Sequence, residues 1–164
     1  VQNPDNSGYS SIYRNNLAKI FDFVAAGGIL VFHDRHVTTA ASVLPGSPGT
    51  FVRTLGTNID ILNATTLVTN GPGGVLTSNS LDGGNFSHHG FVQAAGTPAG
   101  AAGILSTGNA AQWVLYSYPF GAGAVVYSSI PLDFYLAGFG PAQVSQNFRT
   151  IYAPNVLAYA SGLR

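Results

Sequence analysis

The 164-residue sequence contains no cysteine, no methionine and no glutamate. Without cysteine the chain cannot form a disulfide, a thiolate metal site or a thiol nucleophile. Charged residues make up only 7% of the sequence, against roughly a quarter in an average globular domain, and the formal net charge is zero. These absences exclude cysteine-dependent catalysis, and they give no support to a protein steered electrostatically to nucleic acid or an anionic membrane.

The scarcity of charge also bears on location and organisation. A surface built from Gly, Ser, Thr, Asn and Ala favours an extracellular or cell-surface bacterial protein, or one that assembles, over a cytosolic protein. No apolar run reaches the ~20 residues of a membrane-spanning helix. The length predicts a single α/β domain over residues 1–164. Because the sequence begins Val1-Gln2-Asn3 without methionine, we expect a fragment or subunit of a longer precursor.

A helix, a glycine stop and a buried strand follow one another near the start of the chain. Apolar residues at 17, 20, 21 and 24 have helical spacing after a serine N-cap, and Gly27-Gly28 ends the helix. The strand 29–33 is apolar at four consecutive positions, which is typical of a parallel strand covered on both faces. Polar residues follow directly, and open α/β sheets bind their ligands beyond the carboxyl ends of the strands.

The rest of the chain mixes strand-like and glycine-rich segments. Residues 51–55 predict a short helix or turn, and 71–90 a long loop. Further strands are predicted at 59–68, 102–106, 113–118 and 124–130, the last two forming a hairpin about the turn 119–123. A helical stripe runs from Phe148 to Tyr159, where Pro154 kinks the helix or starts a second one. We therefore predict a three-layer α/β sandwich with a mostly parallel, flavodoxin-like sheet and a late antiparallel hairpin.

Three segments carry a family resemblance. Residues 23–33 read Phe-Val-Ala-Ala-Gly-Gly-Ile-Leu-Val-Phe-His, residues 113–127 contain a Gly-Ala-Gly turn, and residues 151–157 belong to the last helix. Together they resemble the class I glutamine-amidotransferase-like fold, especially its ThuA-like relatives in large secreted bacterial proteins. The resemblance implies an amidotransferase-like sheet whose N-terminal part is lacking here. It excludes glutamine hydrolysis, because the family's elbow cysteine and downstream glutamate are absent and His33 stands near the elbow position.

The first candidate site is the polar run that follows strand 29–33. His33 and Asp34 are candidate catalytic residues, since imidazole and carboxylate groups perform acid–base work and ligate metals. The alternative is that Asp34 pairs with Arg35 and caps neighbouring loops, because structural ion pairs mimic active sites. Candidate ligand-binding residues are Arg35, His36, Tyr116 and Tyr135.

The second candidate site is a metal site formed by His88, His89 and Asp82. Adjacent histidines on a strand point in opposite directions, so they bind one ion together only from a loop. The alternative is that both histidines are structural or solvated. We predict no cofactor, while this set of residues leaves room for a divalent metal.

Two functions follow from these patterns. The favoured one is a non-catalytic structural, assembly or ligand-binding module of a secreted or surface bacterial protein. The alternative is a hydrolase or sugar-modifying enzyme that uses His33 and Asp34, with or without a metal. Strand 29–33 needs neighbours on both sides, and in the family order some of them would precede Val1. We therefore expect a second polypeptide or a second copy to complete the sheet, and no nucleic-acid partner.

Overall fold

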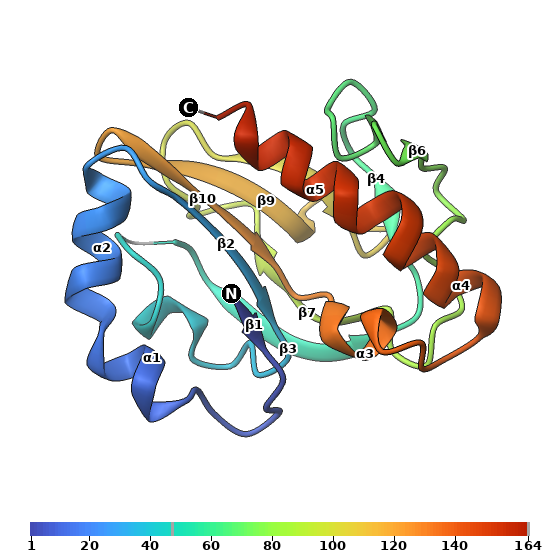
Figure 1. The fold of residues 1–164 in the computed structure, drawn as a ribbon, viewed down its shortest axis with the longest axis horizontal. Coiled ribbons are helices and arrows are strands. Elements are labelled where there is room, and N and C mark those ends of the chain that lie inside the picture. The colour runs from blue at the N-terminus through green and yellow to red at the C-terminus, as the bar shows by residue number, and fades with distance from the viewer. Residues whose placement is uncertain (47, 164) are drawn as a thin grey trace.

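The computed structural model describes residues 1–46 and 48–163 (Figure 1). Within these residues the chain forms ten strands and five α-helices, together with a 3₁₀ turn at Ala40–Ser42 and a π-helical segment at Phe148–Tyr152. The strands are β1 (Gln2–Asn3), β2 (Ile29–Asp34), β3 (Phe51–Gly56), β4 (Asp60–Ile61), β5 (Asn70–Gly71), β6 (Gly74–Val75), β7 (His88–Gln93), β8 (Ala102–Ser106), β9 (Gln112–Phe120) and β10 (Gly123–Ser128). The helices are α1 (Ser11–Asn15), α2 (Leu17–Ala25), α3 (Leu132–Leu136), α4 (Ala142–Asn147) and α5 (Ala153–Ser161).

Eight of these strands form one mixed sheet, and β5 and β6 form a separate small hairpin. The main sheet has the order β1-β2-β10-β9-β7-β3, and β8 pairs with both β9 and β4. Only β1, β2 and β10 are parallel to one another, and every other pairing is antiparallel. The predicted mostly parallel, flavodoxin-like sandwich is therefore wrong.

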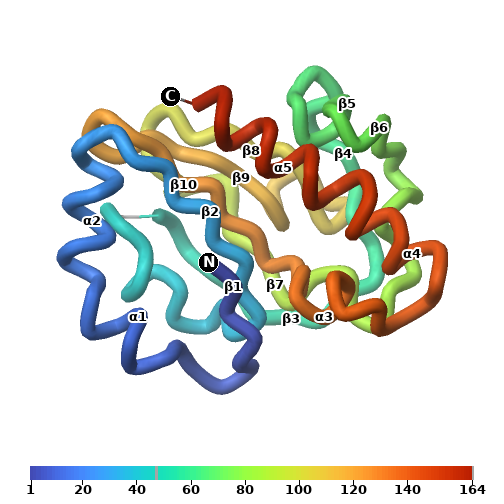
Figure 2. The backbone as a smooth tube through the Cα atoms, in the orientation of Figure 1, coloured from blue at the N-terminus to red at the C-terminus, as the bar shows by residue number. Residues whose placement is uncertain are grey.

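The reason lies in the connections between strands. A parallel neighbour requires a crossover of about a dozen residues or more, usually a helix. From β3 to the end of β10 the described residues contain turns but no helix, so the chain reverses direction from strand to strand. Strands β2 and β10 lie side by side in Figure 2 and are parallel. They become neighbours only after the chain has passed through the antiparallel strands between them.

Both faces of the sheet are covered by apolar side chains. On β10, Val125 and Tyr127 join a core cluster that includes Val24 of α2, whereas Val126 joins a second cluster that includes Val156 of α5. This alternation follows from the period of two along a strand. Helix α5 crosses the sheet on the second face, as Figure 1 shows.

The local signals at the helix ends are confirmed. The hydroxyl of Ser10 accepts a hydrogen bond from the Tyr13 amide at 3.1 Å and caps α1, and Gly27 ends α2 with a φ of 105°. Pro154 stands in the first turn of α5, directly after the π-helical segment, and the backbone stays helical through Tyr152 and Ala153, so Pro154 does not start a separate helix. Proline has no N–H to continue the helical hydrogen-bond ladder, and the π-helical segment lies where that ladder is interrupted.

Several predicted elements differ from those in the structure. Strand 102–106 and the hairpin about 119–123 are confirmed, but residues 51–56 form a strand and not a helix or turn. The predicted strand 59–68 is reduced to the two residues of β4, and the predicted loop 71–90 contains part of β5–β6 and the start of β7. Among the described residues, we find no helix with the length and apolar character needed to cross a membrane.

Candidate ligand-binding site

A cavity of about 400 Å³ opens beyond the carboxyl ends of β2 and β10. Its polar lining residues come from four separate parts of the chain: Asn6, Arg35, Arg53, Asn85 and His89. Its apolar lining residues are Leu55, Phe86, Pro131 and Phe134. The position agrees with the general rule for ligand sites in open α/β sheets, and the size falls within the range of small-molecule pockets.

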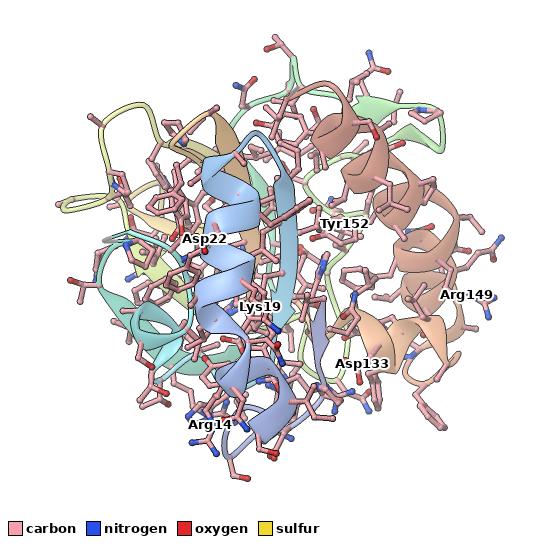
Figure 3. All side chains as sticks on the ribbon, turned by 60° about the vertical axis from the view of Figure 1, so that its left-hand side comes forward. Arg14, Lys19, Asp22, Asp133, Arg149 and Tyr152 are labelled. Carbon is pink, nitrogen blue, oxygen red and sulfur yellow. The ribbon has the colours of Figure 1, made fainter. Side chains whose placement is uncertain are left out.

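Arg35 is held at the cavity wall by an ion pair with Asp133. Its Nε and Nη2 atoms donate to the two carboxylate oxygens at 3.0 and 2.6 Å, which is a bidentate arrangement. The guanidinium carbon also lies 5.7 Å from the centre of the Phe134 ring. Asp133 belongs to the first turn of α3, where Figure 3 labels it. The ion pair orients Arg35 and offsets most of its charge.

Arg53 supplies a positive charge that no carboxylate offsets among the described residues. It lies on β3, and its Nη1 atom donates to the backbone oxygens of Arg35 and His36, the latter at 3.1 Å. These carbonyls anchor one end of the guanidinium. The Nε and Nη2 groups have no hydrogen-bond partner within residues 1–46 and 48–163, so they are free to bind an anion.

His89 presents a neutral hydrogen-bond acceptor to the same cavity. Its Nδ1 atom lies 3.1 Å from the Arg35 carbonyl oxygen, and because a carbonyl only accepts, Nδ1 carries the proton. The Nε2 atom then keeps its lone pair. Burial lowers the pKa of His89, and the nearby guanidinium groups of Arg53 and Arg35 lower it further. At neutral pH the imidazole is therefore uncharged.

Asp34, a predicted catalytic residue, is fully buried outside the cavity lining. Its carboxylate accepts hydrogen bonds from five donors, which organise the N-terminal loop and the turn after β2. The donors are the Asn3 amide, the Tyr9 and Tyr127 hydroxyls, and the backbone N–H groups of His36 and Val37, at 2.8 to 3.1 Å. Val37 adopts a φ of 60°, which is rare for a β-branched residue, and the bond from its N–H to Asp34 stabilises that turn.

His33, the other predicted catalytic residue, lies on the opposite face of the sheet from Asp34, because neighbouring strand residues point in opposite directions. Its Nε2 atom is 3.0 Å from the Tyr152 hydroxyl, which donates to Ser128 Oγ at 3.1 Å. Figure 3 shows Tyr152 on the helical segment that packs against the sheet. Burial lowers the pKa of His33 to about 3, so the ring is neutral. His33 and Asp34 therefore do not form a pair, and neither lines the cavity.

Of the predicted ligand-binding residues, Arg35 alone lines this cavity. His36 lies close by and its Nδ1 atom is 3.1 Å from the Asn6 carbonyl oxygen. Tyr116 is buried, and its hydroxyl donates to the Pro48 carbonyl at 2.7 Å. Tyr135 is also buried, stacked on Phe148 with ring centres 4.1 Å apart.

The predicted metal ligands take separate roles. Asp82 accepts a hydrogen bond from the Ile59 amide at 2.7 Å, and burial lowers the pKa of His88 to about 4. His89 turns to the cavity. Within the described parts of the chain, no three histidine or carboxylate side chains gather into a group able to hold a metal ion.

Arg53 and Phe86 were not predicted as site residues from the sequence. One signal was available for Arg53, because only six residues of the chain are lysine or arginine. A second signal was the long polar loop before β7, which contributes Asn85 and Phe86.

Comparison with known proteins identifies a fold but no family. No family model matches the sequence, and no curated protein matches it either. Among solved structures, a protein of Salmonella typhimurium described as cytoplasmic matches with a TM-score of 0.52 and 17% identity, over 89% of this chain. The chain spans 60% of the length of that protein. A likeness at this identity shows the fold alone.

This comparison corrects the predicted location. Low charge and missing cysteine favoured an extracellular or cell-surface protein, but the same fold occurs in a protein described as cytoplasmic. The prediction of a secreted or surface location is therefore withdrawn. The composition does not determine the location, because a surface poor in charge implies limited repulsion between molecules and no particular compartment.

Proposed function

We propose that this protein is a non-catalytic binding module that holds a small anionic ligand in the cavity beyond β2 and β10. The observation that carries the proposal is the position of Arg53, whose Nε and Nη2 groups lack partners among the described residues while its Nη1 is anchored on two backbone carbonyls. An anchored guanidinium with free donors is suited to carboxylate and phosphate groups.

The surroundings of Arg53 support the same function. The sequence contains only six lysine or arginine residues, yet two arginines line one cavity. Phe86, Phe134 and Pro131 add apolar walls, and a mixture of apolar walls with a few polar groups is typical of small-molecule sites. The cavity therefore suits a ligand that has both an anionic group and an apolar part.

The alternative, a hydrolase or sugar-modifying enzyme based on His33 and Asp34, has less support. The two side chains lie on opposite faces of the sheet and are both buried. All five hydrogen bonds to Asp34 come from groups of the protein itself. A substrate that reached Asp34 would have to displace these donors, whereas a ligand in the cavity would displace none of them.

Phenylacetate, which combines a carboxylate with an aromatic ring, is a direct probe of the proposed function. We expect it to bind in the millimolar range or tighter by isothermal titration calorimetry. Arg53→Gln should weaken binding roughly 10- to 100-fold, the effect of losing a charge-assisted hydrogen bond. Arg14→Gln, on the exposed surface of α1, is the matched control and should leave affinity unchanged. Absence of binding, or equal binding by Arg53→Gln, contradicts the proposal.

We also propose that the β1 edge of the sheet pairs with a second polypeptide or a second copy of this chain. In support, β1 has only two residues, and its register with β2 covers only His33 and Asp34. Exposed strand edges tend to pair with other strands. Light scattering after size exclusion should give a mass above the 16.9 kDa of one chain, either for the protein alone or with its partner. A monomer that shows no association when purified from its natural source at any concentration contradicts this.

A further inference from the structure

The side chains of Arg53 and His89 both donate a hydrogen bond to one backbone carbonyl at the cavity. Both His89 Nδ1 and Arg53 Nη1 hydrogen-bond to the oxygen of Arg35. Two nitrogens that share one acceptor lie within the span of two hydrogen bonds, roughly 6 Å at most. The free donors of Arg53 and the acceptor Nε2 of His89 lie two bonds beyond these nitrogens, on two side chains that line the same cavity.

From this juxtaposition we infer that the ligand is a hydroxy carboxylate, a monocarboxylic acid with a hydroxyl close to the carboxyl group. The inference rests on the proposed anion-binding function and makes it specific. Arg53 binds the carboxylate, and His89 Nε2 accepts the hydrogen bond of the hydroxyl. Because both protein groups line the same cavity, one small ligand can contact both, and an α-hydroxy acid is the shortest ligand that carries the two groups.

The charge of the cavity favours a monoanion over a dianion. Arg35 is paired with Asp133, so the two together contribute almost no net charge. Arg53 then remains as the single uncompensated charge among the described lining residues. A carboxylate matches one positive charge, whereas a phosphate monoester near neutral pH carries between one and two negative charges and would lie close to the Asp133 carboxylate.

The hydroxyl preference comes from His89. A neutral imidazole with its proton on Nδ1 offers a lone pair at Nε2, which needs a donor from the ligand or from water. A plain carboxylate has no donor to offer, so His89 remains without a ligand contact. Sites built to hydrogen-bond a hydroxyl discriminate against analogues that lack it, because a buried polar group is then left unpaired.

The apolar walls define the rest of the ligand. Phe86 and Phe134 line the cavity together with Pro131. Phe86 also meets the edge of the His89 ring, with ring centres 6.1 Å apart. These surfaces fit an aromatic ring or the C–H face of a sugar acid, placed beside the carboxylate end that Arg53 holds.

Mandelate and phenylacetate form a matched pair of probes, because they differ only in the α-hydroxyl group. We expect mandelate to bind wild-type protein at least tenfold more tightly than phenylacetate in calorimetric titrations. Gluconate, a sugar acid with a hydroxyl next to its carboxylate, is tested against sorbitol and distinguishes a sugar acid from an aromatic acid as the preferred form. Phenyl phosphate should bind more weakly than mandelate. Equal or tighter binding of phenyl phosphate contradicts the monoanion argument.

His89→Asn isolates the role of the imidazole acceptor. The asparagine amide can still donate to the Arg35 carbonyl, but it cannot reach the position of Nε2. We expect the ratio of the two dissociation constants, phenylacetate over mandelate, to fall toward one. In wild-type protein the ¹⁵N resonance of His89 Nε2 should shift when mandelate is added and stay in place with phenylacetate, a readout that does not depend on the variant folding.

The outcomes separate this inference from the proposed function. If both acids bind equally and Arg53→Gln weakens both, the anion site stands and the hydroxyl inference is wrong. If neither acid and no sugar acid binds, the anion site itself is wrong and the inference ends with it. If mandelate is preferred but His89→Asn keeps the full preference, another group recognises the hydroxyl and the role assigned to His89 is overturned.

Discussion

Asp34→Ala is expected to lower the free energy of unfolding by about 3–5 kcal/mol, the size of two or three buried donors left unpaired. The carboxylate is fully buried and accepts five hydrogen bonds. Alanine leaves all five donors without their acceptor, and each unpaired buried donor carries a desolvation penalty. The Val37 turn, with its φ of 60°, also loses the bond that stabilises it.

Urea denaturation monitored by circular dichroism measures this effect. Asp22→Ala, at an exposed position of α2, is the matched control and should leave the midpoint unchanged. Asp34→Asn should fall between alanine and wild type, because one amide oxygen can accept only some of the five bonds. If Asp34→Ala unfolds within about 1 kcal/mol of wild type, the size of an ordinary single hydrogen bond, the carboxylate does not organise this region.

Acid is expected to destabilise the protein through His33. The pKa of the buried His33 ring is about 3 in the folded protein, against an ordinary value of 6.5 that applies to the unfolded chain. As the pH falls below 6.5, the unfolded chain binds a proton at His33 and the folded chain does not. Above pH 6.5 the His33 ring is neutral in both the folded and the unfolded state, so it does not make the free energy of unfolding depend on pH. Between about 6.5 and 3 stability falls as pH falls, and at pH 4.5 the loss from this one group is roughly 3 kcal/mol.

His33→Gln tests this pH dependence. Glutamine does not titrate, and its amide can still reach the Tyr152 hydroxyl. The difference in unfolding free energy between pH 7 and pH 4.5 should therefore shrink by roughly 2–3 kcal/mol in the variant. Some acid sensitivity should remain, because burial also lowers the pKa of His88, to about 4. An unchanged difference between the two pH values means that water reaches His33 in the folded protein.

The sequence was sufficient to locate elements whose signal is local. The serine N-cap, the glycine stop, the strand that begins at Ile29 and the hairpin about Gly121 each depend on a few neighbouring residues. Strand direction is not local. The segment from Phe51 to Gly56 is a strand because it pairs with β7, and its own residues do not indicate which strand it pairs with. The mostly parallel sheet was predicted from one buried strand and from the strand order of the family that the sequence resembles. The short turns that connect the strands make most of the pairings antiparallel.

The proposed cavity lies at the end of the sheet where the sequence predicted a site, but other side chains line it. Strand-end reasoning pointed to the carboxyl end of β2, where the cavity lies. Yet His33 and Asp34 are still inside the sheet and are covered on both faces, whereas Arg35 is the first side chain beyond it. His89 was proposed as a metal ligand and instead faces Arg53 across the Arg35 carbonyl. Their meeting depends on the pairing of β3 with β7, which one sequence does not reveal.

The pairing of β2 with β10 has a consequence for how the chain folds during synthesis. Its neighbour β10 lies far along the sequence, and the bond from Tyr127 to Asp34 joins residues 93 positions apart. The hairpin β9–β10 can form from adjacent residues, but β2 emerges from the ribosome early and must wait with its apolar side chains unpaired. Long-range pairing of this kind slows folding and prolongs exposure to aggregation. The rate-limiting event is therefore expected to be the docking of a late hairpin onto an early strand.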